Sequence, residues 1–282
     1  MKTYRRGLII CLFLLFLLSA CTPVRNGGDT LLEVIFLDVG QGDSILLRTK
    51  EGDVLIDAGC EESERELCRK LRTYGVKTLL LAIFSHFDED HIGGADGVLR
   101  EFPAREIWVP TAGAPNEAAR SLLSVAMSSG TNVCEVTAGR MQSVGDIVLF
   151  VFSPKHSAAS DANESGIVFK VTCRNTAALF MGDAGVDTER EMLEEYGAAH
   201  FEASLYKVGH HGSSTSSSMD FLRAVKPDWA VISAAASNSY GHPHGEVLLR
   251  LSQIGATVLR TDRQGAIVFD CDGERFALRN TD

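Results

Sequence analysis

The sequence predicts an α/β domain in which two β-sheets pack face to face and helices cover their outer faces. Short apolar, β-branched runs separated by glycine turns occur in two groups, and charged segments with helical leucine spacing lie among them. Residues 78–85 (TLLLAIFS) are almost entirely apolar. A strand that is apolar on both faces is buried on both faces, so helices must cover this sheet.

The first group of predicted strands comprises residues 31–39, 44–49, 53–59 and 78–85, with a helix over residues 62–74. The second group comprises strands at residues 146–153, 166–173, 177–183, 204–209, 228–235, 257–260, 266–270 and 275–279. Helices are expected there over residues 186–196, 217–225 and 245–254. Because we find no fixed-period repeat, low-complexity segment or interior linker, residues 31–282 are expected to form one domain.

The first twenty residues indicate an export signal. Basic residues precede a short apolar run that ends in Leu-Ser-Ala directly before Cys21, which resembles a bacterial lipoprotein cleavage site. We expect a signal peptide over residues 1–20 and a polar tether over residues 21–30 with lipid on Cys21, which would hold the domain at the extracytoplasmic face of the cell membrane. The alternatives are an uncleaved signal anchor and cleavage at another position.

Charge and cysteine content narrow the classes of function. The chain has 37 acidic residues against 27 basic ones and no basic run, which counts against tight non-specific binding of nucleic acid. Five cysteines follow Cys21, an odd number that excludes a complete set of disulfides. A bridge between Cys60 and Cys68 stays open, because spacing alone does not decide it. Three cysteines lie in strand-like segments and are expected to be small buried side chains: Cys134, Cys173 and Cys271.

The segment SHFDEDHIGG, residues 85–94, concentrates candidate metal ligands at the end of the apolar strand. His86, Asp88, Asp90 and His91 fall within six positions, directly before two glycines. They cannot all point one way from a regular strand, but they can converge from a tight loop. Imidazole nitrogens and carboxylate oxygens are the usual ligands of catalytic divalent metals, so the loop predicts half of a two-metal site. The alternative, a solvated acidic loop, explains this position poorly.

Further motifs extend this prediction. FLDVGQGDS, LIDAG, ALFMGDAG, LYKVGHHGSS and NSYGHP follow one another between about Leu32 and Ile267. SHFDEDHIGG resembles the HxHxDH signature of the metallo-β-lactamase fold, with Asp88 in place of the second histidine. Together the motifs resemble the extracellular hydrolase domain of ComEC-type DNA-uptake (competence) proteins. The resemblance implies an αββα sandwich and a metal-dependent hydrolase.

The resemblance also implies which residues hold two divalent metal ions. His86 and Asp88 would bind the first ion and Asp90 and His91 the second, while Asp183 at the end of FMGD would bridge the two. Asp90 and Asp183 would also orient the attacking water, so both are candidate catalytic residues. For each residue alone, a cap, a turn or a surface position is the plainer interpretation.

Four more residues receive roles from the same resemblance. One of His210 and His211 would complete the second metal site, and the other would support it from behind. Asp57 in LIDAG would steady the metal loop by hydrogen bonds. His242 in YGHPH would protonate the leaving group or hold the substrate, and a purely structural histidine is the alternative.

The chain departs from the family pattern at two positions. Gly166 stands where related sequences usually have serine, which makes a polar substrate contact there doubtful. Where many members have a third histidine, the segment DANESGIVF has Asn163, which would complete or support the first site. A site with few nitrogen ligands suits harder ions, so Mn²⁺ is expected alongside Zn²⁺. The missing histidine also counts against β-lactamase activity.

We expect hydrolysis of a phosphodiester substrate, with extracellular DNA as one candidate, by a phosphodiesterase or nuclease. An alternative substrate is a cell-envelope phosphodiester that carries a choline or teichoic-type substituent. A second alternative is a non-catalytic, metal-bound partner of the DNA-uptake machinery.

Overall fold

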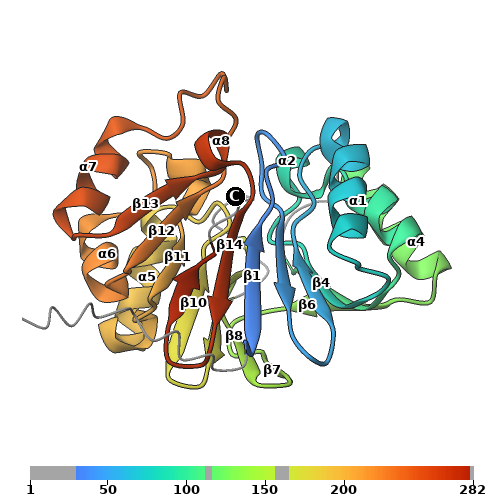
Figure 1. Ribbon diagram of the computed structural model, residues 1–282, viewed down its shortest axis with the longest axis horizontal. Coiled ribbons are helices and arrows are strands. Elements are labelled where there is room, and N and C mark those ends of the chain that lie inside the picture. Colours follow the sequence, from blue (N-terminus) through green and yellow to red (C-terminus); the bar gives the residue numbers. More distant parts are fainter. Residues whose placement is uncertain (1–29, 112–115, 156–164, 280–282) are drawn as a thin grey trace, which may run out of the picture.

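A computed structural model describes residues 30–111, 116–155 and 165–279 of the chain. The predicted signal peptide, Cys21 with nearly all of the tether, and Asn163 lie outside these residues. The described chain forms two mixed β-sheets that face each other, with helices on both outer faces (Figure 1). The predicted αββα sandwich is therefore confirmed. None of the described helices is both long and apolar enough to span a membrane.

The first sheet has eight strands. In order across the sheet they are β15 (Phe276–Leu278), β14 (Ile267–Cys271), β1 (Leu32–Phe36), β2 (Ile45–Arg48), β3 (Asp53–Ile56), β4 (Leu79–Ile83), β5 (Ala104–Pro110) and β6 (Asn132–Val136). Strands β3 to β6 run parallel, and the others are antiparallel to their neighbours. The two last strands of the chain thus return to the first sheet, although the sequence groups them with the second.

The second sheet has seven strands. In order they are β13 (Thr257–Arg260), β12 (Trp229–Ile232), β11 (Leu205–Lys207), β10 (Thr176–Phe180), β9 (Val168–Cys173), β8 (Ile147–Ser153) and β7 (Met141–Val144). Strands β10 to β13 run parallel to one another. Because the carboxyl ends of parallel strands meet at one edge of a sheet, the loops that follow β10, β11 and β12 lie close together.

Three apolar clusters hold the layers together. The largest fills the space between the sheets and includes Phe36, Trp108 and Phe169. A second lies between the first sheet and its helices α1 (Glu64–Thr73), α3 (Ala95–Glu101) and α4 (Glu117–Ser128). The third lies under helices α5 (Val186–Tyr196), α6 (Met219–Val225) and α7 (Gly245–Gln253) of the second sheet. Figure 1 shows these helices on opposite sides of the molecule.

The sequence predicted no element between residues 95 and 144, where the structure has α3, β5, α4, β6 and β7. Strands β6 and β7 are edge strands, and each has only one buried side chain. They therefore lack the apolar pattern of a buried strand. Short helical segments complete the described fold: α2 (Glu89–Ile92), α8 (Thr261–Gln264), η1 (Glu61–Ser63), η2 (Ala198–Phe201) and η3 (Gly209–Gly212).

Candidate metal centre

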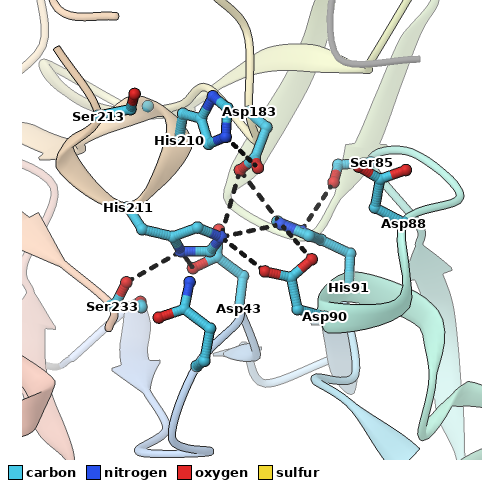
Figure 2. A network of polar contacts seen from close by, with 12 residues as sticks. Asp43, Ser85, Asp88, Asp90, His91, Asp183, His210, His211, Ser213 and Ser233 are labelled. Carbon is cyan, nitrogen blue, oxygen red and sulfur yellow. Dashed lines mark hydrogen bonds and ion pairs between the residues drawn. The ribbon is translucent and has the colours of Figure 1, made fainter. Parts of the chain in front are cut away.

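Loops from both sheets bring the predicted site residues to one place (Figure 2). The loop after β4 carries His86 and Asp88 and continues into α2, which carries Asp90 and His91. Asp183 follows β10, and the histidine pair of η3 follows β11. The site therefore lies where the carboxyl-terminal ends of strands from the two sheets meet, which is the usual place for a ligand site in such sheets.

The backbone around the site takes conformations that ordinary side chains rarely adopt. His210 and His211 both have left-handed backbone angles, with φ of 47° and 52°. Asp57 has a φ of 55°. Residues held in this region cost about 1–3 kcal/mol each and cluster at functional sites. Gly42 lies so close to α2 that a Cβ atom there would be 2.1 Å from the carbonyl oxygen of Asp90.

Asp90, His91 and His211 form the inner set of donors. Nε2 of His91 lies 3.3 Å from Nε2 of His211, and Oδ2 of Asp90 lies 3.2 Å from the latter. Oδ1 of Asp183 lies 3.1 Å from His91 Nε2 and 3.5 Å from His211 Nε2. The donor atoms of Asp90, His91 and His211 lie within 4.8 Å of one another, close enough for one ion to touch all three.

Hydrogen bonds on the far side of each ring determine which nitrogen of the inner set faces the centre. Nδ1 of His91 lies 2.8 Å from Oδ2 of Asp57, and Nδ1 of His211 lies 2.9 Å from the carbonyl oxygen of Ser233. An ionised carboxylate and a carbonyl only accept, so both Nδ1 atoms carry the proton when the rings are neutral. The two Nε2 lone pairs then face each other and two carboxylates, an arrangement that a cation stabilises.

His86, Asp88 and His210 form the outer set on the other side of Asp183. Oδ2 of Asp183 lies 3.9 Å from Nε2 of His86 and 3.5 Å from Nε2 of His210. Asp88 Oδ2 lies 3.6 Å from Nε2 of His86. The two oxygens of Asp183 thus face different sets. The outer set is more open, because the side chains of Asp88 and His210 are 46% and 27% exposed.

His86 also presents its Nε2 lone pair to the centre. Ser85 Oγ donates to Oδ2 of Asp57 at 2.7 Å and accepts from His86 Nδ1 at 3.0 Å. This leaves Nε2 of His86 buried and, among the described residues, without a hydrogen-bond partner, as is Oδ1 of Asp183. Buried polar atoms without partners are costly, so these two fit a site built to bind a cation.

The charges of the site reinforce one another. Burial alone would raise the pKa of the Asp183 carboxyl, but the charges of His211 and His91 hold it well below its usual range. Burial lowers the pKa of His91, and the carboxylates of Asp183 and Asp57 outweigh it and hold that pKa well above the usual value. The pKa of Asp90 is lowered by His211 and His91 despite burial. The centre therefore favours ionised carboxylates and an added positive charge.

His242 lies beside the two histidines of η3. Its ring centre is 5.6 Å from that of His210 and 6.3 Å from that of His211. Burial, with these two neighbours, lowers its pKa to about 4. Its Nδ1 has no hydrogen-bond partner within the described chain, while Asn238 holds its backbone through the N–H and the carbonyl oxygen. A neutral imidazole with a buried Nδ1 therefore lies beside the histidine pair.

The structure brings together every described residue that the sequence proposed for the site. His211 belongs to the inner set, and His210 lies at the opposite oxygen of Asp183, in the outer set. One histidine of the pair is expected from the sequence to support the second site from behind. His210 does not lie there, because it faces the other oxygen of Asp183. Asp57 contacts His91 and Ser85, in keeping with its expected role.

Sequence reasoning assigned no role to a buried ion pair beneath the inner set. Nζ of Lys207 lies 2.7 Å from Oδ2 of Asp43, and both side chains are 1% exposed. Oδ1 of Asp43 lies 3.7 Å from Nδ1 of His211. Asp43 belongs to FLDVGQGDS and Lys207 to LYKVGHHGSS, so a lysine in a short strand-like run and a second aspartate in a glycine-rich turn were the features that could have indicated the pair.

Comparisons with known proteins agree with this geometry. The family model of the metallo-beta-lactamase superfamily matches residues 37–236. The chain is 30% identical to ComE operon protein 3 of Bacillus subtilis and 33% identical to competence protein ComA of Neisseria gonorrhoeae, over 92% and 82% of its length. It spans only about a third of those relatives, 35% and 31%.

Among solved structures, a metallo hydrolase from the archaeon Ignicoccus hospitalis has a similar fold, with a TM-score of 0.55 and 14% identity. The similarity covers 85% of this chain and 99% of that one. The fold and the comparisons point to the same family. The fold has two sheets with flanking helices and a histidine- and aspartate-rich centre at their shared edge, and the matches cover most of the chain. The chain belongs to the metallo-β-lactamase superfamily and resembles competence proteins of the ComEC type.

Proposed function

We propose that this protein is a binuclear metal-dependent phosphodiesterase. One observation carries the proposal: the two oxygens of the buried Asp183 lie near different histidines, Oδ1 near His91 and His211 and Oδ2 near His86 and His210. A carboxylate in this position would bridge two ions, with the inner set around one and the outer set around the other. Asp43 and Asp57 would not touch an ion but would support the inner set through His211 and His91.

The donor sets fit divalent ions by their chemistry. With the shared Asp183 counted in each, the inner set offers two nitrogens and two carboxylates, and the outer set offers His86, His210 and two carboxylates. Mixed nitrogen and oxygen donors suit both Zn²⁺ and Mn²⁺. The third histidine of the wider family is absent from this chain, and His210 would supply a nitrogen ligand in its place.

When bound, the two ions would activate a water molecule and neutralise the negative charge that develops on the phosphoryl group. The protein's own side chains would position the reactants. Asp90 and Asp183 would accept hydrogen bonds from the attacking water and orient it. His242 would hold the substrate or its leaving group from its position beside His210 and His211.

Two classes of phosphodiester are candidates. The resemblance to competence proteins favours extracellular DNA, and the partly exposed outer set would admit a chain end or a single strand. The formal net charge of −10 favours a smaller cell-envelope phosphodiester, such as a choline or teichoic-type substituent, because an acidic surface repels polyanions.

We also propose that lipid on Cys21 anchors the protein at the extracytoplasmic face. The small residues before Cys21 support this, and Cys21 lies outside the described residues. A Cys21→Ser variant should then remain as precursor or be released from the membrane, as seen by gel mobility and fractionation. A variant that partitions into membranes with unchanged mobility contradicts the anchor.

The enzyme proposal is tested by adding Mn²⁺ or Zn²⁺ to metal-free protein. Turnover would be measured on bis-p-nitrophenyl phosphate, p-nitrophenyl phosphorylcholine, single-stranded DNA and a chromogenic β-lactam. We expect hydrolysis of at least one phosphodiester and none of the β-lactam. Asp183→Asn should abolish it, and Asp187→Asn, the same change at a carboxylate 70% exposed on α5, should not. Tight binding of two ions without turnover would favour the non-catalytic partner of DNA uptake.

A further inference from the structure

Two buried cysteines from different sheets meet in the core of the sandwich. Cys173 is the last residue of β9 in the second sheet, and Cys271 is the last residue of β14 in the first. Both are 0% exposed and belong to the apolar cluster between the sheets. Their side chains are neighbours in this cluster, and both thiols are free in the described structure.

The chain on either side holds these two positions together. The backbone N–H of Asn175 donates to the carbonyl oxygen of Gly273 at 2.8 Å, two residues beyond each cysteine. Nδ2 of Asn175 also donates to Oε1 of Glu274 at 2.8 Å. A Cβ atom on Gly273 would be 2.8 Å from Cδ of Arg174, so the two turns are in close contact. The two thiols therefore lie beside two hairpin turns that are hydrogen-bonded to each other.

We propose that Cys173 and Cys271 form a disulfide that cross-links the two sheets. Each thiol loses a proton, one S–S bond forms, and the two electrons reduce the disulfide of an exchange partner, oxidised glutathione or a thiol–disulfide oxidoreductase, to thiols. Because both sulfur atoms are fully buried, exchange takes place before the sheets close over them. The bond is expected in an oxidising compartment, so its presence in the cell rests on the proposed export.

The other three cysteines of the described chain have different neighbours. Cys60 contacts Ser63 and Glu62, and Cys68 contacts Glu101. Cys134 accepts from Nδ2 of Asn132 at 3.3 Å. The odd number of cysteines is thus explained by one pair and three thiols.

The pair lies at the end of the sandwich remote from the metal centre. Cys173 pairs with Thr176 at the start of β10, whereas Asp183 follows the end of the same strand. A bond between β9 and β14 therefore constrains the unfolded chain and the sheet packing without touching the donor sets. It should change the melting temperature and leave metal content unchanged.

The test is refolding of the reduced chain in a glutathione redox buffer, followed by alkylation in denaturant without reductant and peptide mapping. We expect one linked peptide pair, containing Cys173 and Cys271, and alkylation of Cys60, Cys68 and Cys134. Protein refolded with dithiothreitol, which keeps both thiols reduced, should have a Tm ~5–15 °C below that of the oxidised protein. After removal of dithiothreitol and addition of metal, both samples should bind the same amount of metal.

Two variants make the result decisive. Cys60→Ser/Cys68→Ser should keep the linked peptides and the effect of dithiothreitol, whereas Cys173→Ser/Cys271→Ser should lose both and still bind metal. Alkylation of Cys173 and Cys271 in the refolded wild type, or equal Tm values after refolding with and without dithiothreitol, would overturn the disulfide. Loss of metal in every sample would instead count against the proposed function.

Discussion

The two donor sets on either side of Asp183 differ in how firmly the protein holds them. In the inner set both histidines are buried, and each donates its outer N–H to a fixed acceptor, Asp57 or the carbonyl of Ser233. In the outer set only His86 is buried, while Asp88 and His210 are partly exposed. Supporting hydrogen bonds orient ligands before an ion arrives. We therefore expect the inner set to bind an ion more tightly than the outer set.

The shared residue gives the largest expected effect. Asp183→Asn removes the charge that both sets use, so both ions should be lost together and metal-dependent turnover should fall below detection. Bound metal would be measured by mass spectrometry of the elements, beside kcat/KM for bis-p-nitrophenyl phosphate. Asp187→Asn is the matched control. Loss of one ion alone would mean that Asp183 is not shared.

The buried ion pair beneath the inner set gives the next effect. Lys207→Met leaves the carboxylate of Asp43 buried without its 2.7 Å partner, which costs about 3–5 kcal/mol of unfolding free energy. Urea unfolding of metal-free protein measures this cost. The double variant Asp43→Asn/Lys207→Met should recover part of it, because no charge is left unpaired. A loss below about 1 kcal/mol, typical of exposed pairs, would contradict the burial of this pair.

A smaller effect should separate the two sets. Asp57→Asn weakens the hydrogen bond that orients His91, so the affinity of the inner set should fall by roughly 10–100-fold. The outer set should change less. Competition with a chromogenic chelator resolves the two binding steps in wild type and variant. Equal weakening of both steps would show that the sets do not differ in the way proposed.

The smallest expected effect is a change of metal preference in the outer set. Asp88→His replaces an oxygen donor by nitrogen. Because imidazole generally favours Zn²⁺, the ratio of Mn²⁺- to Zn²⁺-supported kcat/KM should fall roughly several-fold. Bound metal is quantified in each sample. An unchanged ratio with both forms fully loaded would mean that Asp88 does not bind the ion.

The candidate ligands that follow β4 could be predicted from the sequence, because four histidines and aspartates within six residues (86–91) leave few other interpretations. The two-sheet architecture followed from apolar strands that alternate with helices. The return of β14 and β15 to the first sheet was not predicted, since strand pairing between distant segments leaves no local periodicity. Edge strands β6 and β7 were missed because their faces are only partly buried.

The remaining gaps in the site have the same physical origin. Asp43 and Lys207 come from loops and strands of different sheets, and only the folded chain brings them to 2.7 Å. The sequence also did not separate His210 from His211. Their left-handed backbone angles turn adjacent imidazoles to opposite oxygens of Asp183, a geometry that no residue pattern specifies.

The most direct test of the central claim is to locate the ions themselves. Crystals of the protein soaked in Mn²⁺ would be measured at the manganese absorption edge, and anomalous difference peaks would be placed relative to Asp183. We expect two peaks, each next to a different oxygen of Asp183. One should lie in the inner set, among Asp90, His91 and His211, and the other in the outer set, among His86, Asp88 and His210. A single peak, or two peaks that do not share Asp183, would contradict it.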